Sequence, residues 1–461
     1  MDHPLLLRQT LELDAIAAAA GMADRPGTIL LDGQRHWHGV GRSALLFDPV
    51  ATVRASADGT LVWSGGRPWL GASVAAGPQV LAALRRQLPR IPGAHFLGFA
   101  GWVSYDLGPA RWGVRHPVAP PFDAPDLWLG LYETALVFAS DSPPRLLVAD
   151  LRGQHDAAAL RRRAAAAAET LQAAAARPAP AGGSTLGAPS TPDAGWHRRA
   201  VAEIHRFLRQ GDAYQINLTG FTSARTDRHP WPVFLGERRR NPVPFAAYLN
   251  CGELTLTSHS PERLLRQVGR HVETAPIKGT APAAVGDAAR LLASPKDRAE
   301  HVMIVDLARN DLGRSCEFGS VRVRGMMEEL RLRGLVHLVS RVRGRLRPGA
   351  EAQLWEDIFP GGSITGAPKR RAMEIISSIE QTGRGPYTGT IGYCDATGVG
   401  DWNIAIRTAV WQDGAVHFGT GGGVVIDSDP AAEYAEAQLK AASFLESLAT
   451  PTPLLRAGAG S

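Results

Sequence analysis

The stretch HVETAPIKGTAP, residues 271–282, places a lysine where an amine could react. Apolar and polar residues alternate up to Pro276 as in a half-buried strand, and Gly279 then turns the chain, so Lys278 is predicted to lie at a strand end. Partial burial lowers the pKa of an amine, so that more of it is neutral and nucleophilic. Taken alone, the stretch also fits a lysine that extends from a strand end to the surface.

Two predicted helices carry carboxylates spaced about one turn apart. Asp297 and Glu300 follow the helix start in ASPKDRAEHVM, and Glu433 and Glu436 follow the start in DSDPAAEYAEAQLK. Each start has a capping Ser or Asp followed by proline, and the spacing places each pair on one helix face. Acidic residues in a first turn also suit the helix dipole and can simply face solvent. If the two faces meet, they suit Mg²⁺, which takes few protein carboxylates and completes its shell with water and substrate oxygens.

Glycine-rich segments and isolated polar side chains offer further ligand contacts. The glycines of GTGGGVVID, Gly421–Gly423, allow a backbone to approach an anion closely, although a bulge or tight turn is an equal interpretation. In FPGGSITGAPKRR, the free N–H groups before the helix at Pro368 and the hydroxyl of Thr365 suit a small carboxylate. Arg407, predicted within a strand, could hold a carboxylate, and His337 could orient a hydroxyl, but each also fits a structural role.

Composition narrows the class of protein. The 461 residues are 44% hydrophobic, as in a globular chain with a large core. No stretch of about 18 apolar residues and no basic-then-apolar leader is present, so we expect a cytoplasmic protein without a membrane segment. The net charge is +6, but the arginines of VRVRG and SRVRGRLRPG alternate with apolar residues and lack aromatic neighbours, so no nucleic-acid binding is expected. Cys251, Cys316 and Cys394 are scattered, which favours core positions over a disulfide or zinc site.

The pattern of elements divides the chain into segments. Four strand-like runs, GTILLDG, SALLFDP, GTLVWSGG and ETALVFAS, predict a β-rich lobe over residues 1–176. The Pro, Gly and Ser residues of 177–195 indicate a linker. Strands and helices alternate over residues 196–449, which contain every motif described above, and residues 450–461 form a tail. The chemistry is therefore expected in the second part of the chain.

Together these motifs resemble the chorismate-utilising enzymes. The stretches SHSPERLL, PIKGT, KDRAEHVMIVDLARNDLGR, HLVS, FPGGSITGAPKRRAMEII, IGY, IAIRT and GTGGGVVIDSDPAAEYAEAQLKA follow one another in that family's order over about residues 196–448, and HFLGFAGWVSYDLG extends a weaker match into the first lobe. The resemblance implies an α+β protein with the chorismate-utilising enzyme fold, a two-lobed β-sheet sandwich with helices packed on the outside. It also implies an enzyme that acts on chorismate.

The resemblance implies that Lys278 selects the reaction. Anthranilate-forming members typically have alanine there, in PIAGT, whereas PIKGT is similar to the members that aminate ring carbon 4. In those members the lysine attacks carbon 2 and expels the 4-hydroxyl, and ammonia then adds at carbon 4 and displaces the lysine. Glu262, in SPERLL, matches the general acid that protonates the hydroxyl. Gln215 argues against the isochorismate and salicylate branches, in which a lysine base stands at that position, because an amide takes no proton.

The resemblance further implies a set of ligand contacts. Glu300 and Glu436 would hold Mg²⁺ against the ring carboxylate of chorismate, with Asp297 and Glu433 as neighbouring, water-holding groups. The contacts to the rest of the substrate would come from Arg407 and Tyr393 at the enolpyruvyl carboxylate, from the backbone of Gly421, Gly422 and Gly423, and from Thr365 and His337.

Partners and alternatives follow from the same resemblance. No cysteine sits in a glutaminase-like motif, so ammonia is expected from a separate glutamine amidotransferase subunit, and the 4-amino product would serve 4-aminobenzoate and folate synthesis. Family members often bind tryptophan in the first lobe, and GTILLDGQRHWHG matches the relevant motif loosely. The alternatives are an anthranilate-forming enzyme, and a non-catalytic or nucleic-acid-binding relative of these enzymes.

Overall fold

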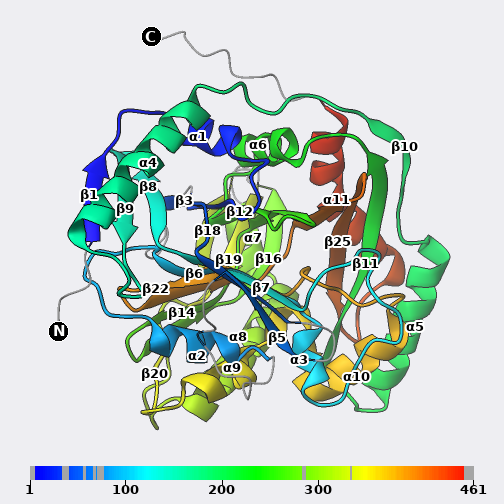
Figure 1. The fold of residues 1–461 in the computed structure, drawn as a ribbon. Coiled ribbons are helices and arrows are strands. Elements are labelled where there is room, and N and C mark those ends of the chain that lie inside the picture. The colour runs from blue at the N-terminus through cyan, green and yellow to red at the C-terminus, as the bar shows by residue number, and fades with distance from the viewer. Residues whose placement is uncertain are drawn as a thin grey trace.

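The structure is a computed structural model that describes residues 6–33, 41–55, 59–65, 69, 77–282, 287–332 and 335–450. Two large antiparallel sheets and a smaller one occupy its centre, and helices surround them (Figure 1). The main hydrophobic core lies between the two large sheets, because it joins buried side chains of both, such as Leu249 and Trp102. This arrangement confirms the predicted α+β sandwich with helices on the outside.

The larger sheet has 12 strands and combines both parts of the chain. Its order is β1-β9-β8-β3-β2-β12-β13-β24-β25-β11-β10, and β21 pairs with β11 beside this path. The strands are β1 (Leu6–Thr10), β2 (Ile29–Asp32), β3 (Ser43–Leu46), β8 (Thr134–Ala139), β9 (Ser142–Ala149), β10 (Thr185–Ser190), β11 (Gln215–Thr226), β12 (Phe245–Asn250), β13 (Thr255–Ser260), β21 (Gly366–Ala367), β24 (Thr408–Gln412) and β25 (Ala415–Val424).

The second large sheet has 10 strands in the order β17-β20-β15-β14-β23-β22-β6-β7-β4-β5, and a three-stranded sheet has the order β16-β19-β18. The strands of the second sheet are β4 (Ala51–Ala55), β5 (Leu61–Ser64), β6 (Gly98–Val103), β7 (Leu127–Tyr132), β14 (Arg263–Val268), β15 (His271–Ala275), β17 (Arg322–Val323), β20 (Val342–Arg345), β22 (Thr390–Asp395) and β23 (Val399–Asn403). The third sheet consists of β16 (Ile277–Pro282), β18 (Glu328–Leu332) and β19 (Leu335–Val339).

Helices cover the outer faces of the sheets, with α5, α10 and α11 gathered on one side and α2, α8 and α9 on another (Figure 1). Two of the predicted starts are confirmed: Pro295 begins α8, and Asp429 caps α11 by accepting hydrogen bonds from Ala431 N and Ala432 N. The helices are α1 (Ala15–Gly21), α2 (Val80–Gln87), α3 (Leu107–Ala110), α4 (Ala157–Ala175), α5 (Ala194–Arg209), α6 (Pro230–Arg240), α7 (Asp287–Ala293), α8 (Pro295–Ser315), α9 (Glu351–Ile358), the 3-10 turn η1 (Gly362–Ile364), α10 (Lys369–Ile379) and α11 (Pro430–Ala449).

The sheets do not divide where the sequence pattern predicts a linker. The four predicted strands of the first part are present as β2, β3, β5 and β8, but β2 pairs with β12 and β6 pairs with β22. Residues 177–195 contain β10, which pairs with the outer edge of β11. Both large sheets therefore contain strands from before and after this segment. Within the described residues, no helix is both long and apolar enough to cross a membrane.

Candidate active site

Lys278 lies inside a strand. Pro276 separates β15 from β16, and Lys278 is the second residue of β16, paired with Leu338 of β19. The strand-end prediction was wrong because the chain re-enters a sheet directly after the proline. The side chain is 17% exposed, and Glu300 Oε2 lies 4.0 Å from its Nζ. Burial lowers the pKa of Lys278, and the negative charge of Glu300 opposes this shift. The amine is thus closer to neutrality than a surface lysine.

Glu262 provides a buried carboxyl near Lys278. It follows β13 and is 3% exposed. Ser363 Oγ donates a hydrogen bond to Glu262 Oε1 at 2.8 Å, and Ile277 N, next to Lys278, donates to the same oxygen at 3.4 Å. Burial raises the pKa of Glu262 to about 7, although both hydrogen bonds and the charge of Lys278 oppose the rise. A carboxyl with a pKa near neutrality can both give and take a proton under physiological conditions.

Helices α8 and α11 both bring carboxylates to the region of Lys278 and the three glycines. Glu300 of α8 lies 4.0 Å from the amine of Lys278, and the negative charge of Glu436 of α11 also raises the pKa of Lys278. Lys440 Nζ binds Glu436 Oε1 at 2.8 Å and donates to the carbonyl of Gly421 at 2.8 Å. Glu433 accepts a hydrogen bond from Ser428 Oγ at 2.7 Å. Asp297 belongs to α8, but its side chain is outside the described part of the structure.

These carboxylates have the chemistry of a magnesium site. Their oxygens are the hard ligands that Mg²⁺ prefers, and a site with one or two protein carboxylates is typical for this ion. In the structure, Lys278 and Lys440 provide the positive charge beside Glu300 and Glu436. The donor atoms suit a divalent cation, which would have to displace Lys278 from Glu300 and Lys440 from Glu436, so the magnesium site stays a prediction.

A second acidic cluster does not fit a metal ion. Glu133, Asp150 and His155 bring their ligand atoms within 4.8 Å of one another, the one such group of three among the described residues. Glu133 is already bound by Arg152 and by Arg163, the latter at 2.8 Å. The two guanidinium groups neutralise the negative charge that would attract a cation. This cluster is therefore structural.

Substitution of Glu300 and Glu436 tests the predicted metal site. We expect Glu300→Gln and Glu436→Gln each to lower Mg²⁺-dependent turnover of chorismate by about tenfold or more, because each removes a charged ligand. Calorimetric titration with Mg²⁺ in the presence of chorismate should show weaker binding in both variants. Glu446→Gln, an exposed change further along α11, serves as the control and should behave as the wild type. Unchanged Mg²⁺ binding in both site variants would remove these residues from the metal site.

The three glycines allow close packing of the strand around the lysine. Gly421–Gly423 lie within the continuous strand β25, in regular register with Asn217–Thr219 of β11, so the bulge interpretation is wrong. A Cβ atom added at Gly421 would lie 2.2 Å from the carbonyl oxygen of Leu218, and one at Gly423 would lie 3.0 Å from Lys278 Nζ. A side chain at either position would therefore displace the backbone or the amine.

Arg407 and His337 lie side by side. His337 is buried in β19, and its Nε2 lies 3.4 Å from Arg407 Nη2. The sequence predicted Arg407 within a strand. In the structure it lies in the connection between β23 and β24. Its φ of 51° is in the left-handed region, which a non-glycine residue adopts at a cost in free energy. A backbone hydrogen bond of 3.0 Å, from His259 N to the carbonyl oxygen of Arg407, stabilises this conformation. Burial lowers the pKa of His337 to about 3, so this ring is neutral.

The segment between α9 and α10 presents a different hydroxyl from the one predicted. Thr365 is fully buried and donates its hydrogen bond to the carbonyl of Gly361 at 2.9 Å. Ser363, two residues earlier, contacts Glu262. Arg384 fixes the segment to β11, because its guanidinium donates to the carbonyls of Ile364 at 2.7 Å and Asn217 at 2.9 Å. Thr365 thus stabilises the turn, and Ser363 faces Glu262.

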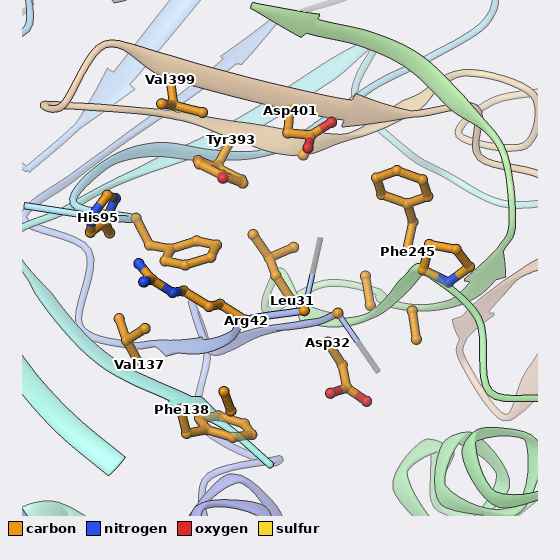
Figure 2. A pocket seen from close by; sticks show the side chains of 18 of the residues that line it. Leu31, Asp32, Arg42, His95, Val137, Phe138, Phe245, Tyr393, Val399 and Asp401 are labelled. Carbon is orange, nitrogen blue, oxygen red and sulfur yellow. The ribbon is translucent and has the colours of Figure 1, made fainter. Parts of the chain in front are cut away.

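Tyr393 is not brought to this site. It lies on β22 with its ring 4.6 Å from that of Phe96, and it lines a cavity of about 850 Å³ between the two large sheets. Figure 2 shows Tyr393 on one side of this cavity and Val137 on the other. Arg407 is not among the residues that line the cavity. The structure thus places Tyr393 in this cavity and does not bring it together with Arg407, as the assignment to the enolpyruvyl carboxylate required.

The cavity beside Tyr393 has the character of a small-molecule site. Its walls combine apolar side chains, such as Leu31, Phe138 and Phe245, with charged ones of both signs: Arg8, Asp32, Arg42, Asp141, Arg145, Arg266 and Asp401. Figure 2 shows Asp32, Arg42 and Asp401 among them. Its volume is in the range of ligand pockets. It contains Leu31 and Asp32 of the GTILLDG stretch, where the resemblance places tryptophan. Tryptophan binding stays a prediction.

Three residues near Lys278 were not identified as site residues from the sequence. Ser363 contacts Glu262, and Lys440 joins Glu436 to the glycine strand. The buried ring of His301 lies 2.6 Å from Ser340 Oγ through Nε2 and also contacts the backbone of Lys278. A signal existed for Lys440, since it follows Glu436 by four residues on an exposed helix face.

Comparison with known proteins identifies the class. Residues 27–446 match the chorismate binding enzyme family, and the chain belongs to it. An aminodeoxychorismate synthase of Streptomyces griseus is 36% identical over 467 residues, covering 98% of this chain and 62% of that protein. The chain thus spans less than two thirds of this relative. Aminodeoxychorismate synthase component 1 of Bacillus subtilis (strain 168) is 34% identical over 362 residues, covering 76% of this chain and 77% of that protein.

The solved structures give the same fold. Anthranilate synthase component I from Streptococcus pneumoniae TIGR4 superimposes with a TM-score of 0.75 at 28% sequence identity, covering 89% of this chain and 93% of that chain. The chain is therefore similar to synthases with two different products. The family and the fold are common to both, so they do not distinguish the two reactions.

Proposed function

We propose that this chain is an aminodeoxychorismate synthase component I, which converts chorismate and ammonia to 4-amino-4-deoxychorismate. The observation that carries the proposal is the amine of Lys278, whose pKa is lowered by burial, beside the buried acid Glu262. A neutral amine is a nucleophile, and a protonated carboxyl next to it can assist a leaving hydroxyl. The names of the Streptomyces griseus and Bacillus subtilis relatives support this reaction.

The proposed chemistry has two displacements. In the first, the nitrogen lone pair of Lys278 forms a bond to carbon 2, the ring double bonds shift, and the bond from carbon 4 to its oxygen breaks. Glu262 gives its proton to this oxygen, which leaves as water. In the second, ammonia bonds to carbon 4, the double bonds shift back, and the bond from carbon 2 to Lys278 breaks, which frees a neutral lysine. The new ammonium group returns one proton to Glu262, so the site is restored.

The surrounding groups would hold the two carboxylates of the substrate. Mg²⁺ held by Glu300 and Glu436 would neutralise the ring carboxylate. Arg407, whose unusual backbone conformation is consistent with a binding role, would bind the enolpyruvyl carboxylate beside His337. Lys440 holds the carbonyl of Gly421 and so steadies the strand against which the ring would lie.

Ammonia would come from a glutamine amidotransferase subunit. The cysteines of this chain, Cys251, Cys316 and Cys394, are all buried, and burial raises the pKa of each thiol to about 12, 11 and 12, respectively. A cysteine nucleophile instead needs a thiolate. The component 1 name of the Bacillus subtilis relative is also consistent with a partner subunit.

Identification of the product tests the proposal. We expect the purified chain to convert chorismate, Mg²⁺ and an ammonium salt at raised pH to the 4-amino product, and to form none with glutamine in place of ammonium. Addition of an amidotransferase subunit should confer the use of glutamine. Chromatography against standards separates the 4-amino product from anthranilate and isochorismate. Anthranilate as the main product would favour the second candidate, anthranilate synthase component I, which the Streptococcus pneumoniae structure represents.

A further inference from the structure

Lys369 is a buried lysine that the proposed reaction does not use. It is the first residue of α10, and its side chain is 9% exposed. Its Nζ donates hydrogen bonds to Asp311 Oδ2 at 2.8 Å and to the carbonyls of Asp357 at 2.7 Å and Ile358 at 3.3 Å. An ammonium group has three donors, so these bonds use all of them. Moving such a group out of water is costly, and its place in the fold requires an explanation.

The ammonium group closes the base of a loop. Asp357 and Ile358 are the last residues of α9, and the last carbonyls of a helix have no partners within it. Lys369 binds these two carbonyls from the start of the next helix. Residues 359–368 lie between the two helices and include η1 and Ser363. Lys369 therefore holds the two ends of this loop together.

The ion pair with Asp311 also fixes the loop on α8. One face of α8 carries residues spaced three or four apart, which are Glu300, Ile304, Leu307 and Asp311. Gly362 of η1 packs on the middle of this face, because a Cβ atom added there would collide with the side chain of Leu307. Asp311 binds the loop at one end of the face, and Glu300 lies beside Lys278 at the other.

The loop brings a hydroxyl to the acid of the proposed reaction. Ser363 Oγ donates a hydrogen bond to Glu262 Oε1 at 2.8 Å. Burial raises the pKa of Glu262 to about 7, and the hydrogen bonds from Ser363 and Ile277 and the charge of Lys278 oppose the rise. The position of the loop therefore contributes to the pH at which Glu262 loses its proton.

The charges around Lys369 depend on one another. Burial lowers the pKa of Lys369, the charges of Asp311 and Asp357 oppose this shift, and the charge of Arg111 adds to it. Burial raises the pKa of Asp311, and the charges of Lys369 and Arg314 oppose that rise. Removal of Lys369 alone would leave the Asp311 carboxylate buried without its nearest cation, which is strongly destabilising. A test of Lys369 must therefore change both partners.

We infer that Lys369 is a positioning residue, and that its ion pair with Asp311 holds the loop on α8 so that Ser363 meets Glu262. This inference deepens the proposed function and rests on it. Lys369 itself transfers no proton and forms no bond to the substrate. It acts on the reaction through the hydrogen bond at the acid.

The double variant Lys369→Met with Asp311→Leu removes both charges and leaves neither of them buried alone. An acid with a pKa of about 7 gives the profile of chorismate turnover a break near pH 7, measured with the concentration of free NH₃ held constant. We expect the double variant to move this break up by about one pH unit, because Glu262 loses the hydrogen bond that lowers its pKa. Ser363→Ala should move it equally, and should add no further shift when combined with the double variant.

Two further variants separate positioning from stability. Lys369→Gln with Asp311→Asn keeps neutral polar side chains at both places and should move the break in the same direction. Arg163→Met is the matched control, because Arg163 binds another buried carboxylate, that of Glu133, at 2.8 Å. This control should lose stability and keep the break near pH 7.

The pH dependence of unfolding gives a second readout that needs no turnover. Each protein is compared with the same protein carrying Glu262→Gln, and the titration of Glu262 should move by the same amount as the break. If the Lys369 variants lose stability while Glu262 titrates as in the wild type, or if Ser363→Ala adds its full shift to theirs, Lys369 is only structural and the inference fails. If unfolding shows the shift but the wild type makes no 4-amino product, the positioning stands and the proposed function fails.

Discussion

Lys278→Ala is expected to slow formation of the 4-amino product by about a hundredfold or more, because the covalent route is replaced by a direct attack for which the site is not arranged. Chorismate binding should be nearly unchanged, since the carboxylates are held by other groups. Residual ammonia chemistry should move toward carbon 2, which the shorter side chain leaves open. Rate and product identity, measured beside the wild type, check both expectations.

Lys278→Arg is the control for charge. The guanidinium stays positive and is a poor nucleophile, so this variant keeps the cation near Glu300 but should be as slow as the alanine variant. Intact mass spectrometry of the wild type after brief exposure to chorismate should show an adduct that neither variant forms. A 4-amino product made at near wild-type rate by Lys278→Ala would show that the lysine has no covalent role.

Glu262→Gln is expected to lower the rate by about 10²–10⁴, because the amide cannot protonate the departing hydroxyl. The pKa of Glu262 is raised to about 7, so the wild-type carboxyl carries its proton below pH 7 and loses it above. Lys278 changes in the other direction and becomes neutral as the pH rises. The two titrations give a bell-shaped profile with one break near pH 7, measured with the concentration of free NH₃ held constant. That break should be absent in Glu262→Gln.

Unfolding measurements supply a readout for Glu262 that does not depend on catalysis. The folded pKa of about 7 lies above the ordinary value of 4.5, so the folded protein binds this proton more tightly than the unfolded chain. The stabilisation is fully present below pH 4.5 and is lost as the pH rises through 7. The stability of the wild type relative to Glu262→Gln should therefore fall by ~3 kcal/mol over this range. A constant difference would show that the carboxyl titrates normally and is not the acid.

The sequence predicted local features better than the arrangement of distant segments. The capping and proline signals gave the starts of α8 and α11, because these signals lie within a few residues of the helix start. The strands of the first part were also recognisable from short apolar runs. These features depend on neighbouring residues in the chain.

The errors concern features that the local pattern does not contain. Tyr393 belongs to a strand that is buried on nearly every residue, so nothing in the sequence shows which face its ring takes. Arg407 has a left-handed φ that propensities assign to glycine, and a strand was predicted instead. Ser363 rather than Thr365 faces Glu262 because of the 3-10 turn η1, whose backbone the sequence does not reveal. The position of Gln215 beside the glycine strand follows from the pairing of β11 with β25, which a local pattern does not show.

The pairing of β6 with β22 has a consequence for folding during synthesis on the ribosome. Roughly 290 residues lie between these two strands, and the ribosome adds about 5–20 residues per second. Strand β6 is therefore synthesised about 15–60 s before β22. During this time the edge of β6 that pairs with β22 is unpaired. Such non-local sheets close slowly, and exposed edges invite aggregation. Production of the chain should accordingly depend on chaperones that hold exposed strands until the sheet is complete.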